Sequence, residues 1–120
     1  MSRQDAREQA LKLLYASDLT DRSSELAPTG RAGRIVAGVR EHDAEIDALI
    51  ESHATGWRVG RMPAIDRAIL RIGVYELQFT ETPVGVVVSE AVELAKRYST
   101  AKSGAFVNGV LAGIAVSRGQ

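Results

Sequence analysis

Apolar residues recur at helical spacing along most of this chain, and this periodicity restricts the fold more than any other feature of the sequence. From residue 4 to residue 19, alanine, leucine and tyrosine side chains fall on one broad face at 100° per residue. Nowhere do four or more residues alternate between apolar and polar convincingly enough to predict a strand. The 120 residues fit one compact domain. We therefore predict a single all-α domain, 1–120, built from about six helices.

Glycine, proline, serine and aspartate mark the predicted ends of these helices. The periodicity breaks over 20–34, where serines, a proline and glycines are clustered, so a helix is predicted to resume only from about 34 to 42. Asp43 is the predicted N-cap of the following helix. Pro63 suits the first turn of a later helix, because its missing N–H would have no partner there.

Two further helices are predicted near the C-terminus. Residues 84–98 contain three successive valines that would suit a strand, but the length of the segment favours a helix. Ser103 is the predicted N-cap of the last helix, which carries the poor helix residues Asn108 and Gly109. We interpret Asn108 as a buried amide, and Gly109 and Gly113 as points where a neighbouring helix approaches closely, with Gly73 a candidate for the facing surface.

Residues that could carry catalysis or bind a metal are sparse. The absence of cysteine excludes a disulfide framework, a cysteine-based zinc site and a thiol nucleophile. His42 and His53 are 11 residues apart and lack neighbouring ligands at metal spacing. Asp66 and Glu76 belong to one predicted helix, which separates them by about 15 Å along its axis, too far to act as an acid–base pair. We expect no enzyme, no cofactor and no metal site.

Charge and hydrophobicity restrict the partners of the chain. The longest apolar runs have about five residues, against the roughly 20 needed to cross a bilayer, and the N-terminus lacks an apolar signal core. We expect a soluble cytoplasmic protein without membrane contact. Residues 1–56 carry seven Lys/Arg and ten Asp/Glu, a net −3, whereas residues 57–120 carry eight and five, a net +3. This asymmetry is too small for a dedicated nonspecific nucleic-acid binder.

Three arginines in apolar surroundings have two open interpretations. Arg3 and Arg7 lie one helical turn apart at the start of the chain, and Arg71 lies in the middle of an apolar helix. For Arg7 and Arg71, a structural ion pair and contact with a ligand are equally compatible with the sequence. All three are candidate RNA-binding residues.

A second group of candidates flanks the junction before the last helix. Lys96 and Arg97 could form an ordinary solvated face, or Lys96 and Lys102 could bind a phosphate backbone. Phe106 could be simple core or could stack on an unpaired base, since single-stranded RNA is bound through stacking together with charge. Lys96, Lys102 and Phe106 are the second set of candidate RNA-binding residues.

Three blocks of this sequence, in this order, resemble the transcription antitermination factor NusB family. They are Ile-Asp-Arg-Ala-Ile-Leu-Arg-Ile-Gly-Val-Tyr-Glu-Leu at 65–77, Glu-Ala-Val-Glu-Leu-Ala-Lys at 90–96 and Phe-Val-Asn-Gly-Val-Leu at 106–111. The resemblance implies an all-helical fold of two small packed subdomains, about 1–58 and 59–120. Because the segment after the first helix is short, we expect a smaller N-terminal half in which a helix present in relatives is missing or reduced.

The resemblance also implies a function. Family members bind single-stranded boxA-type RNA of ribosomal RNA leaders together with the ribosomal protein NusE, join RNA polymerase elongation complexes indirectly, and suppress premature termination. By position, the residues that match RNA-contacting ones are Arg3, Arg7, Lys102 and Phe106, and those that match NusE-facing ones are Tyr15 and Asp66.

The chain departs from the family pattern near its start. Gln4 and Asp5 stand where further basic residues would be expected, which should weaken RNA affinity and its salt dependence. Lys102 stands at a position that is often acidic in relatives, which would partly offset this loss. Some family members form homodimers that hide the RNA-binding face, and a homodimer is compatible with this sequence. Two alternatives stay open: a module that acts with an rRNA methyltransferase, and a helical scaffold that binds only protein.

Overall fold

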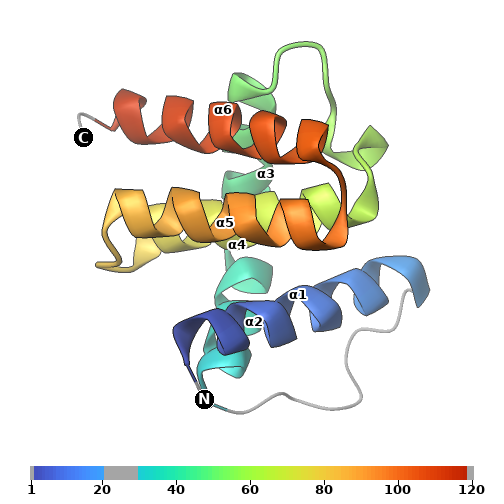
Figure 1. Ribbon diagram of the computed structural model, residues 1–120, viewed down its shortest axis with the longest axis vertical. Helices are drawn as coiled ribbons and strands as arrows, with labels where there is room; N and C mark the ends of the chain where they lie inside the picture. Colours follow the sequence, from blue (N-terminus) through green and yellow to red (C-terminus); the bar gives the residue numbers. More distant parts are fainter. Residues whose placement is uncertain (1, 21–29, 119–120) are drawn as a thin grey trace.

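The computed structural model describes residues 2–20 and 30–118, which form six α-helices and one 3₁₀ turn (Figure 1). In chain order the elements are α1 (Arg3–Thr20), α2 (Gly30–Glu41), α3 (Asp43–His53), η1 (Val59–Arg61), α4 (Ala64–Phe79), α5 (Val84–Tyr98) and α6 (Ala101–Ser117). This described part contains no strand, so the all-α prediction is confirmed. None of its helices is long and apolar enough to cross a membrane.

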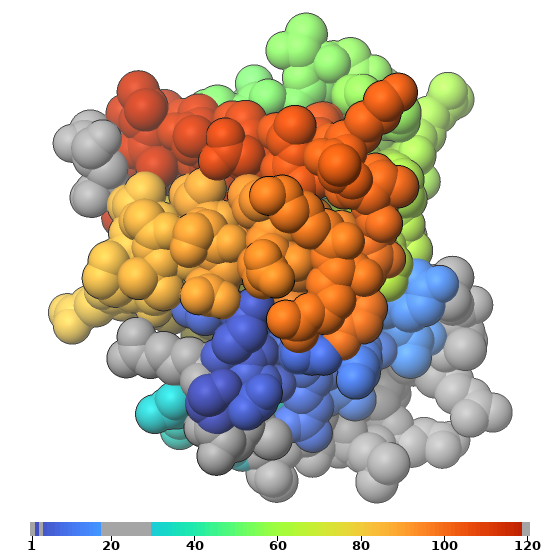
Figure 2. Space-filling model, in the orientation of Figure 1, coloured from blue at the N-terminus to red at the C-terminus, as the bar shows by residue number. Residues whose placement is uncertain are grey.

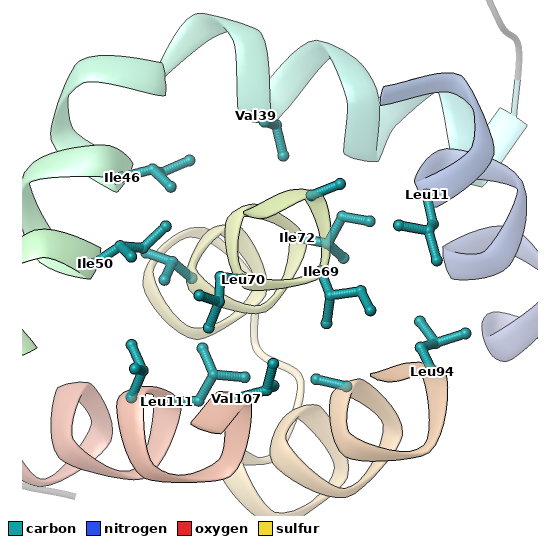
Figure 3. Packing of buried hydrophobic residues seen from close by; sticks show 14 of the residues in the cluster. Leu11, Val39, Ile46, Ile50, Ile69, Leu70, Ile72, Leu94, Val107 and Leu111 are labelled. Carbon is teal, nitrogen blue, oxygen red and sulfur yellow. The ribbon is translucent and has the colours of Figure 1, made fainter. Parts of the chain in front are cut away.

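Helix α4 lies at the centre of the fold and contacts all five other helices. Figure 3 shows it end-on, with apolar side chains of the surrounding helices pointing toward it. Ile69, Leu70 and Leu77 of α4 are almost fully buried in this core. The predicted boundary between subdomains, at 58/59, falls just before α4. The division stays a prediction, because α4 packs against helices from both sides of that boundary.

Proline and glycine explain where several helices begin. Pro83 takes the N-cap position of α5, which spans the predicted residues 84–98. Helix α2 is present and begins at Gly30, four residues before the predicted start, and Gly30 adopts a left-handed φ of 69° that glycine tolerates. The rest of the interruption, residues 21–29, lies outside the described residues. The prediction of Asp43 as an N-cap is wrong, because Asp43 is already the first residue of α3.

The prediction of Ser103 as the N-cap of α6 is also wrong. Thr100 has extended backbone angles, and its hydroxyl oxygen accepts a hydrogen bond from the Ser103 N–H at 3.0 Å. Both residues carry hydroxyl groups three positions apart, so the sequence pattern alone fits either of them. Because Ser103 lies within the first turn, its own hydroxyl is directed into the protein instead of capping the helix.

The interpretation of Asn108 and Gly109 as packing residues is wrong. Both are exposed, and a Cβ atom built on Gly109 would meet nothing within 4 Å. The close approach of α4 and α6 occurs instead at Gly73, where a Cβ atom would lie 2.7 and 2.9 Å from the two terminal methyl carbons of Leu111. Gly73 is therefore required for this packing, whereas Asn108 and Gly109 face away from it. For Gly113 the prediction of a close approach is confirmed, because a Cβ atom there would lie 3.2 Å from Cδ2 of His53 in α3.

Surface contacts attach α1 to α5, and Figure 2 shows α1 lying along the side of α5 that faces away from α6. Glu8 of α1 accepts hydrogen bonds from Arg97, at 3.1 Å, and from the Tyr98 hydroxyl. The Glu8 carboxylate raises the pKa of Tyr98, because it accepts a hydrogen bond that only the protonated phenol can donate. The C-terminal end of α5 is thereby linked to the first helix.

Ser2 and Asp5 together cap the start of α1. The Asp5 N–H donates to the Ser2 hydroxyl at 3.1 Å, and the Ser2 N–H donates to the Asp5 carboxylate at 3.3 Å. This reciprocal arrangement is a capping box. Hydrogen bonding from Ser2 lowers the pKa of Asp5. Asp5, where the resemblance predicts a basic residue, therefore has a structural role at the helix terminus.

Candidate functional site

A pocket with aromatic walls lies between the segment before α4 and the first turns of α6. These two parts of the backbone come together at the right of Figure 1. We call it the Trp57–Phe106 pocket. It has a volume of about 230 Å³. Its lining residues are Trp57, Met62, Pro63, Asp66, Lys102, Ser103 and Phe106. The structure therefore brings together three residues predicted to bind RNA or NusE, namely Lys102, Phe106 and Asp66.

The cap at Thr100 explains how α6 presents its residues to this pocket. With the helix starting at Ala101, the residues Lys102, Ser103 and Phe106 lie within one turn of each other and face the same side. Phe106 is half-buried and makes an edge-to-face contact with Trp57, with ring centroids 6.2 Å apart. Trp57 is 49% exposed, so one aromatic ring at the pocket is open to a binding partner.

Asp66 is the one acidic residue that lines this pocket. It lies in the first turn of α4 and is only 4% exposed. Its Oδ2 accepts a hydrogen bond from the Ser103 hydroxyl at 2.8 Å. Its Oδ1 is closed off from water and has no hydrogen-bond partner within the described parts of the chain. Asp66 therefore forms part of the pocket wall through a side chain that is almost entirely shielded from solvent.

Two arginines that the sequence analysis missed extend the positive charge around Trp57. A second pocket that shares Trp57 with the first is lined by Gly56, Trp57, Arg58 and Arg61. Arg58 and Arg61 are exposed, as is Lys102. We call these three residues the basic rim. The signal in the sequence was the only tryptophan of the chain, set beside an arginine and between two glycines.

Lys96 approaches the same end of α6 from α5. Its head is exposed, while its carbon chain packs over Gly104, where a Cβ atom would lie 3.2 Å from the Lys96 Cγ. This arrangement is typical of a lysine that covers apolar surface and keeps its charge in water. Lys96 is therefore accessible to a ligand bound at the start of α6.

Arg7 makes a buried ion pair, which is one of the two interpretations that the sequence left open. It is 3% exposed, and its Nε and Nη2 donate to the two carboxylate oxygens of Glu76 at 2.7 and 2.8 Å. The structure thus favours the ion-pair interpretation, because both donors are directed at Glu76 and the side chain is closed off from water. A separate cavity of about 330 Å³ next to this pair includes the exposed residues Arg31 and Arg34.

The other predicted site residues lie apart from the pocket lining. Arg71 of α4 donates to Asp47 of α3 at 2.9 and 3.0 Å, and the pair is partly buried, which again favours a structural ion pair. Tyr15 is a half-buried residue of α1. Arg3 begins α1, but its side chain lies outside the described residues. Its contact with RNA and that of Tyr15 with NusE stay predictions.

The chemistry of this surface suits binding. Within residues 2–20 and 30–118, no group of three or more His, Cys, Asp or Glu residues is placed to hold a metal ion. An exposed tryptophan, a half-buried phenylalanine and three cationic side chains offer both stacking and phosphate contacts. The surface is thus equipped to bind an unpaired nucleic-acid strand.

Comparison with known proteins decides the family. A family model described as the NusB family matches residues 4–116. The chain belongs to the NusB family. The transcription antitermination protein NusB of Acidothermus cellulolyticus is 48% identical, and the match covers 94% of this chain and 86% of that protein. NusB of Clavibacter sepedonicus is 41% identical, with 98% of each chain covered.

Solved structures of NusB proteins have the same fold. Thermotoga maritima NusB superposes with a TM-score of 0.86 at 33% identity, over 97% of this chain and 92% of that one. A chain in the crystal structure of antitermination factors NusB and NusE in complex with double-stranded RNA superposes with a TM-score of 0.81 at 32% identity, covering 96% of both chains. The predicted NusB-like helical bundle is confirmed.

Proposed function

We propose that this NusB-family chain is a transcription antitermination factor. It binds boxA-type RNA of ribosomal RNA leaders together with NusE, and the complex suppresses premature termination by RNA polymerase. The observation that carries this proposal is the match of residues 4–116 to the NusB family. The near-complete superposition on a chain from a structure of NusB and NusE with double-stranded RNA supports it. RNA polymerase is reached indirectly, through the assembled complex.

The Trp57–Phe106 pocket and the basic rim supply the RNA-binding surface in this proposal. Lys102 and Phe106 lie on one turn of α6, and Lys96 is exposed beside that turn. Arg3 stays in the proposal as a residue at the open end of α1. Arg7 and Arg71 do not, because their guanidinium groups are bonded to Glu76 and Asp47. The RNA-binding surface is therefore centred on α6.

The small number of cations around the Trp57–Phe106 pocket predicts weak binding by the chain alone. Each phosphate contact on a single strand contributes about 0.7 to the slope of log K against log salt. The three residues of the basic rim, together with Lys96 and Arg3, would then give a slope of about −3.5. Such a slope is typical of a weak contact, so NusE is needed to raise the affinity. Tyr15, exposed in part on α1, is a proposed NusE contact.

We further propose that the chain acts by binding and not by catalysis, and that it works in the cytoplasm where ribosomal RNA is transcribed. Aromatic and cationic side chains dominate the site, and its only carboxylate, Asp66, is bonded to Ser103. Such a set can hold RNA but offers no paired acid and base for chemistry. A homodimer that covers this surface would compete with RNA for it.

Titration of fluorescently labelled boxA RNA with this chain, with and without NusE, tests the proposal. We expect weak binding alone, a clear gain with NusE, and a smaller gain for a scrambled RNA. Lys102→Ala should lower the salt slope by about 0.7. Arg118→Ala is the matched control, because Arg118 is exposed at the other end of α6, about 24 Å away. Equal gains for boxA and scrambled RNA would contradict the proposal.

A further inference from the structure

Two arginines of α2 carry positive charge that the rest of the fold does not use. Arg31 and Arg34 lie one turn apart on the helix, are both exposed, and both line the cavity of about 330 Å³ between α2, the start of α1 and the end of α4. In the described parts of the chain, neither arginine makes an ion pair. Arg31 also lies in the first turn of α2, where the helix dipole disfavours a cation. Helix stability therefore does not explain this charge.

We propose that this cavity is a second RNA-binding site, in which Arg31 and Arg34 hold backbone phosphates of a single strand that continues beyond boxA. We call it the α2 phosphate site. The proposal rests on the RNA-binding function proposed above and adds a contact to it. The site shares no lining residue with the pockets on either side of Trp57. In Figure 1, α2 lies at the bottom of the molecule, whereas the start of α6 lies higher, at the right.

The wall of the cavity has a net positive charge. Its only carboxylate is that of Glu76, which is 7% exposed and accepts hydrogen bonds from Arg7 at 2.7 and 2.8 Å. These two buried charges cancel, so the two exposed arginines of α2 set the charge that a ligand meets. The exposed carboxylates of Asp5 and Glu81 belong to neighbouring segments but do not line the cavity. An anionic ligand is therefore attracted here.

The arrangement of the donors suits a phosphate chain. A guanidinium group presents a planar fork of N–H donors that matches the oxygens of a phosphate. Two such forks, one helical turn apart, can bind both free oxygens of one phosphate or bind two successive phosphates. The oxygens of a carboxylate lie in one plane and fill a single fork. A strand of RNA therefore uses both arginines better than an acidic segment of a protein does.

The remaining wall suits the sugar and base that accompany a phosphate. Tyr75, Thr80 and Thr82 are half-buried and line the cavity, so an aromatic ring and two hydroxyl groups border it. The volume lies at the lower end of the roughly 300–1,000 Å³ that is typical of small-molecule pockets. The cavity thus has room for part of one nucleotide while the adjoining phosphates contact the arginines.

The test compares labelled boxA RNA with the same RNA extended on both sides by uridines, each with saturating NusE. The extended RNA should bind more tightly at low salt. Two added phosphate contacts on a single strand should steepen the slope of log K against log salt by about 1.4. The gain in affinity from the extension should therefore shrink about sevenfold between about 50 and about 200 mM salt. An extension that adds neither affinity nor slope would overturn the proposal.

Arg31→Gln/Arg34→Gln should remove both the gain from the extension and the added slope. Arg31→Lys/Arg34→Lys should keep the slope but recover only part of the affinity, because lysine retains the charge without the fork. The matched control is Lys12→Gln/Arg118→Gln, which removes two exposed positive charges elsewhere and should keep the gain. An equal loss in this control would show a general effect of charge and refute the site.

Thermal unfolding distinguishes an RNA contact from a role in the fold. The double glutamine variant of α2 should melt no lower than the unmodified chain, because it removes a cation from the first turn of a helix. A lower melting temperature together with an unchanged gain from the extension would assign the two arginines to the fold and refute the proposal.

Polyuridylate and polyglutamate of equal charge test the kind of partner. The same double variant should bind polyuridylate more weakly than the unmodified chain does, and polyglutamate equally well. If only polyglutamate binding weakened, the cavity would belong to an acidic protein segment and the proposal would be wrong.

The outcomes also separate this inference from the proposed function. If boxA RNA binds with NusE but the extension adds nothing, only the α2 phosphate site is refuted. If boxA and scrambled RNA gain equally from NusE while the gain from the extension still depends on Arg31 and Arg34, the proposed function fails and the site stands. If no RNA binds in any form, both fail.

Discussion

Replacing Arg7 by methionine should destabilise the fold strongly while leaving the salt dependence of RNA binding intact. Both donors that Arg7 directs at Glu76 are lost, and the Glu76 carboxylate stays buried between α1 and α4 with its charge uncompensated. Breaking a buried pair from one side costs about 3–5 kcal/mol. For a domain of this size the melting temperature should then fall by about 10–20 °C.

Thermal unfolding followed by circular dichroism measures this effect. Arg97→Met is the matched control, because Arg97 also joins α5 to α1 through a carboxylate, that of Glu8, but on the surface. An exposed pair contributes at most about 1 kcal/mol, so this control should melt within a few degrees of the unmodified protein. The double variant Arg7→Met/Glu76→Met should recover most of the lost stability, since replacing both partners removes the unpaired charge.

A specific result would refute this reasoning about Arg7. If Arg7→Met melted like the unmodified chain and instead flattened the salt slope of RNA binding, Arg7 would be a phosphate contact. The ion pair with Glu76 would then not describe its role in solution. The interpretation from the family resemblance would be correct and the one from the structure wrong.

Two other predictions follow from packing and from titration. Gly73→Ala should destabilise the fold by about 1–3 kcal/mol, because the new Cβ would overlap the buried side chain of Leu111. Gly109→Ala should stabilise the fold by about 0.5–1 kcal/mol, because alanine has the better helix propensity and its Cβ meets nothing. Urea unfolding measures both changes in free energy, and equal losses of stability in the two variants would contradict the assignment of the two glycines. The raised pKa of Tyr98 means that the folded state favours the protonated phenol. The hydrogen bond from Tyr98 to Glu8 therefore contributes to stability below about pH 10, and this contribution is lost as the pH rises through the raised pKa. Absorbance titration should show one tyrosine ionising late, and Glu8→Gln should lower its pKa; an unchanged titration curve would exclude the contact.

The helices could be predicted largely from the sequence, because their ends are marked by local chemistry. Helix α5 spans the predicted residues, since Pro83 before it and Ser99 after it stop the pattern. The capping residues were harder to predict from the sequence. Thr100 and Ser103 both carry hydroxyl groups, and only the backbone angles show which of the two caps α6. Local sequence identifies a helix more reliably than it identifies the residue that caps it.

The mistake about Asn108 and Gly109 has a simple cause. The buried residues of α6 include Val107, Val110 and Leu111, and at 100° per residue the two positions between them turn outward. The apolar composition of the segment suggested that the helix is buried on all sides. One face of α6 is nevertheless exposed, and the residues on it, such as Ala105 and Gly109, are small and leave little apolar surface in water. The close approach at Gly73 could be predicted, but its actual partner could not.

The candidate site could be predicted only in part. Lys102 and Phe106 are close in sequence, and their common position on one helical turn follows from the helix itself. Trp57 reaches Phe106 across 49 positions of the chain, and Asp66 reaches Ser103 across 37, so only the folded arrangement brings them together. The ion pairs that remove Arg7 and Arg71 from the site are likewise long-range contacts that no local pattern reveals.

Transcription read-through tests the proposed function most directly. The template carries a ribosomal RNA leader with an intact or a scrambled boxA ahead of a terminator, and the transcription extract has been depleted of this protein. Adding the protein back should raise read-through on the intact template, should do so only when NusE is present, and should leave the scrambled template unchanged. Equal read-through on both templates, or no response to the protein, would contradict its role as an antitermination factor.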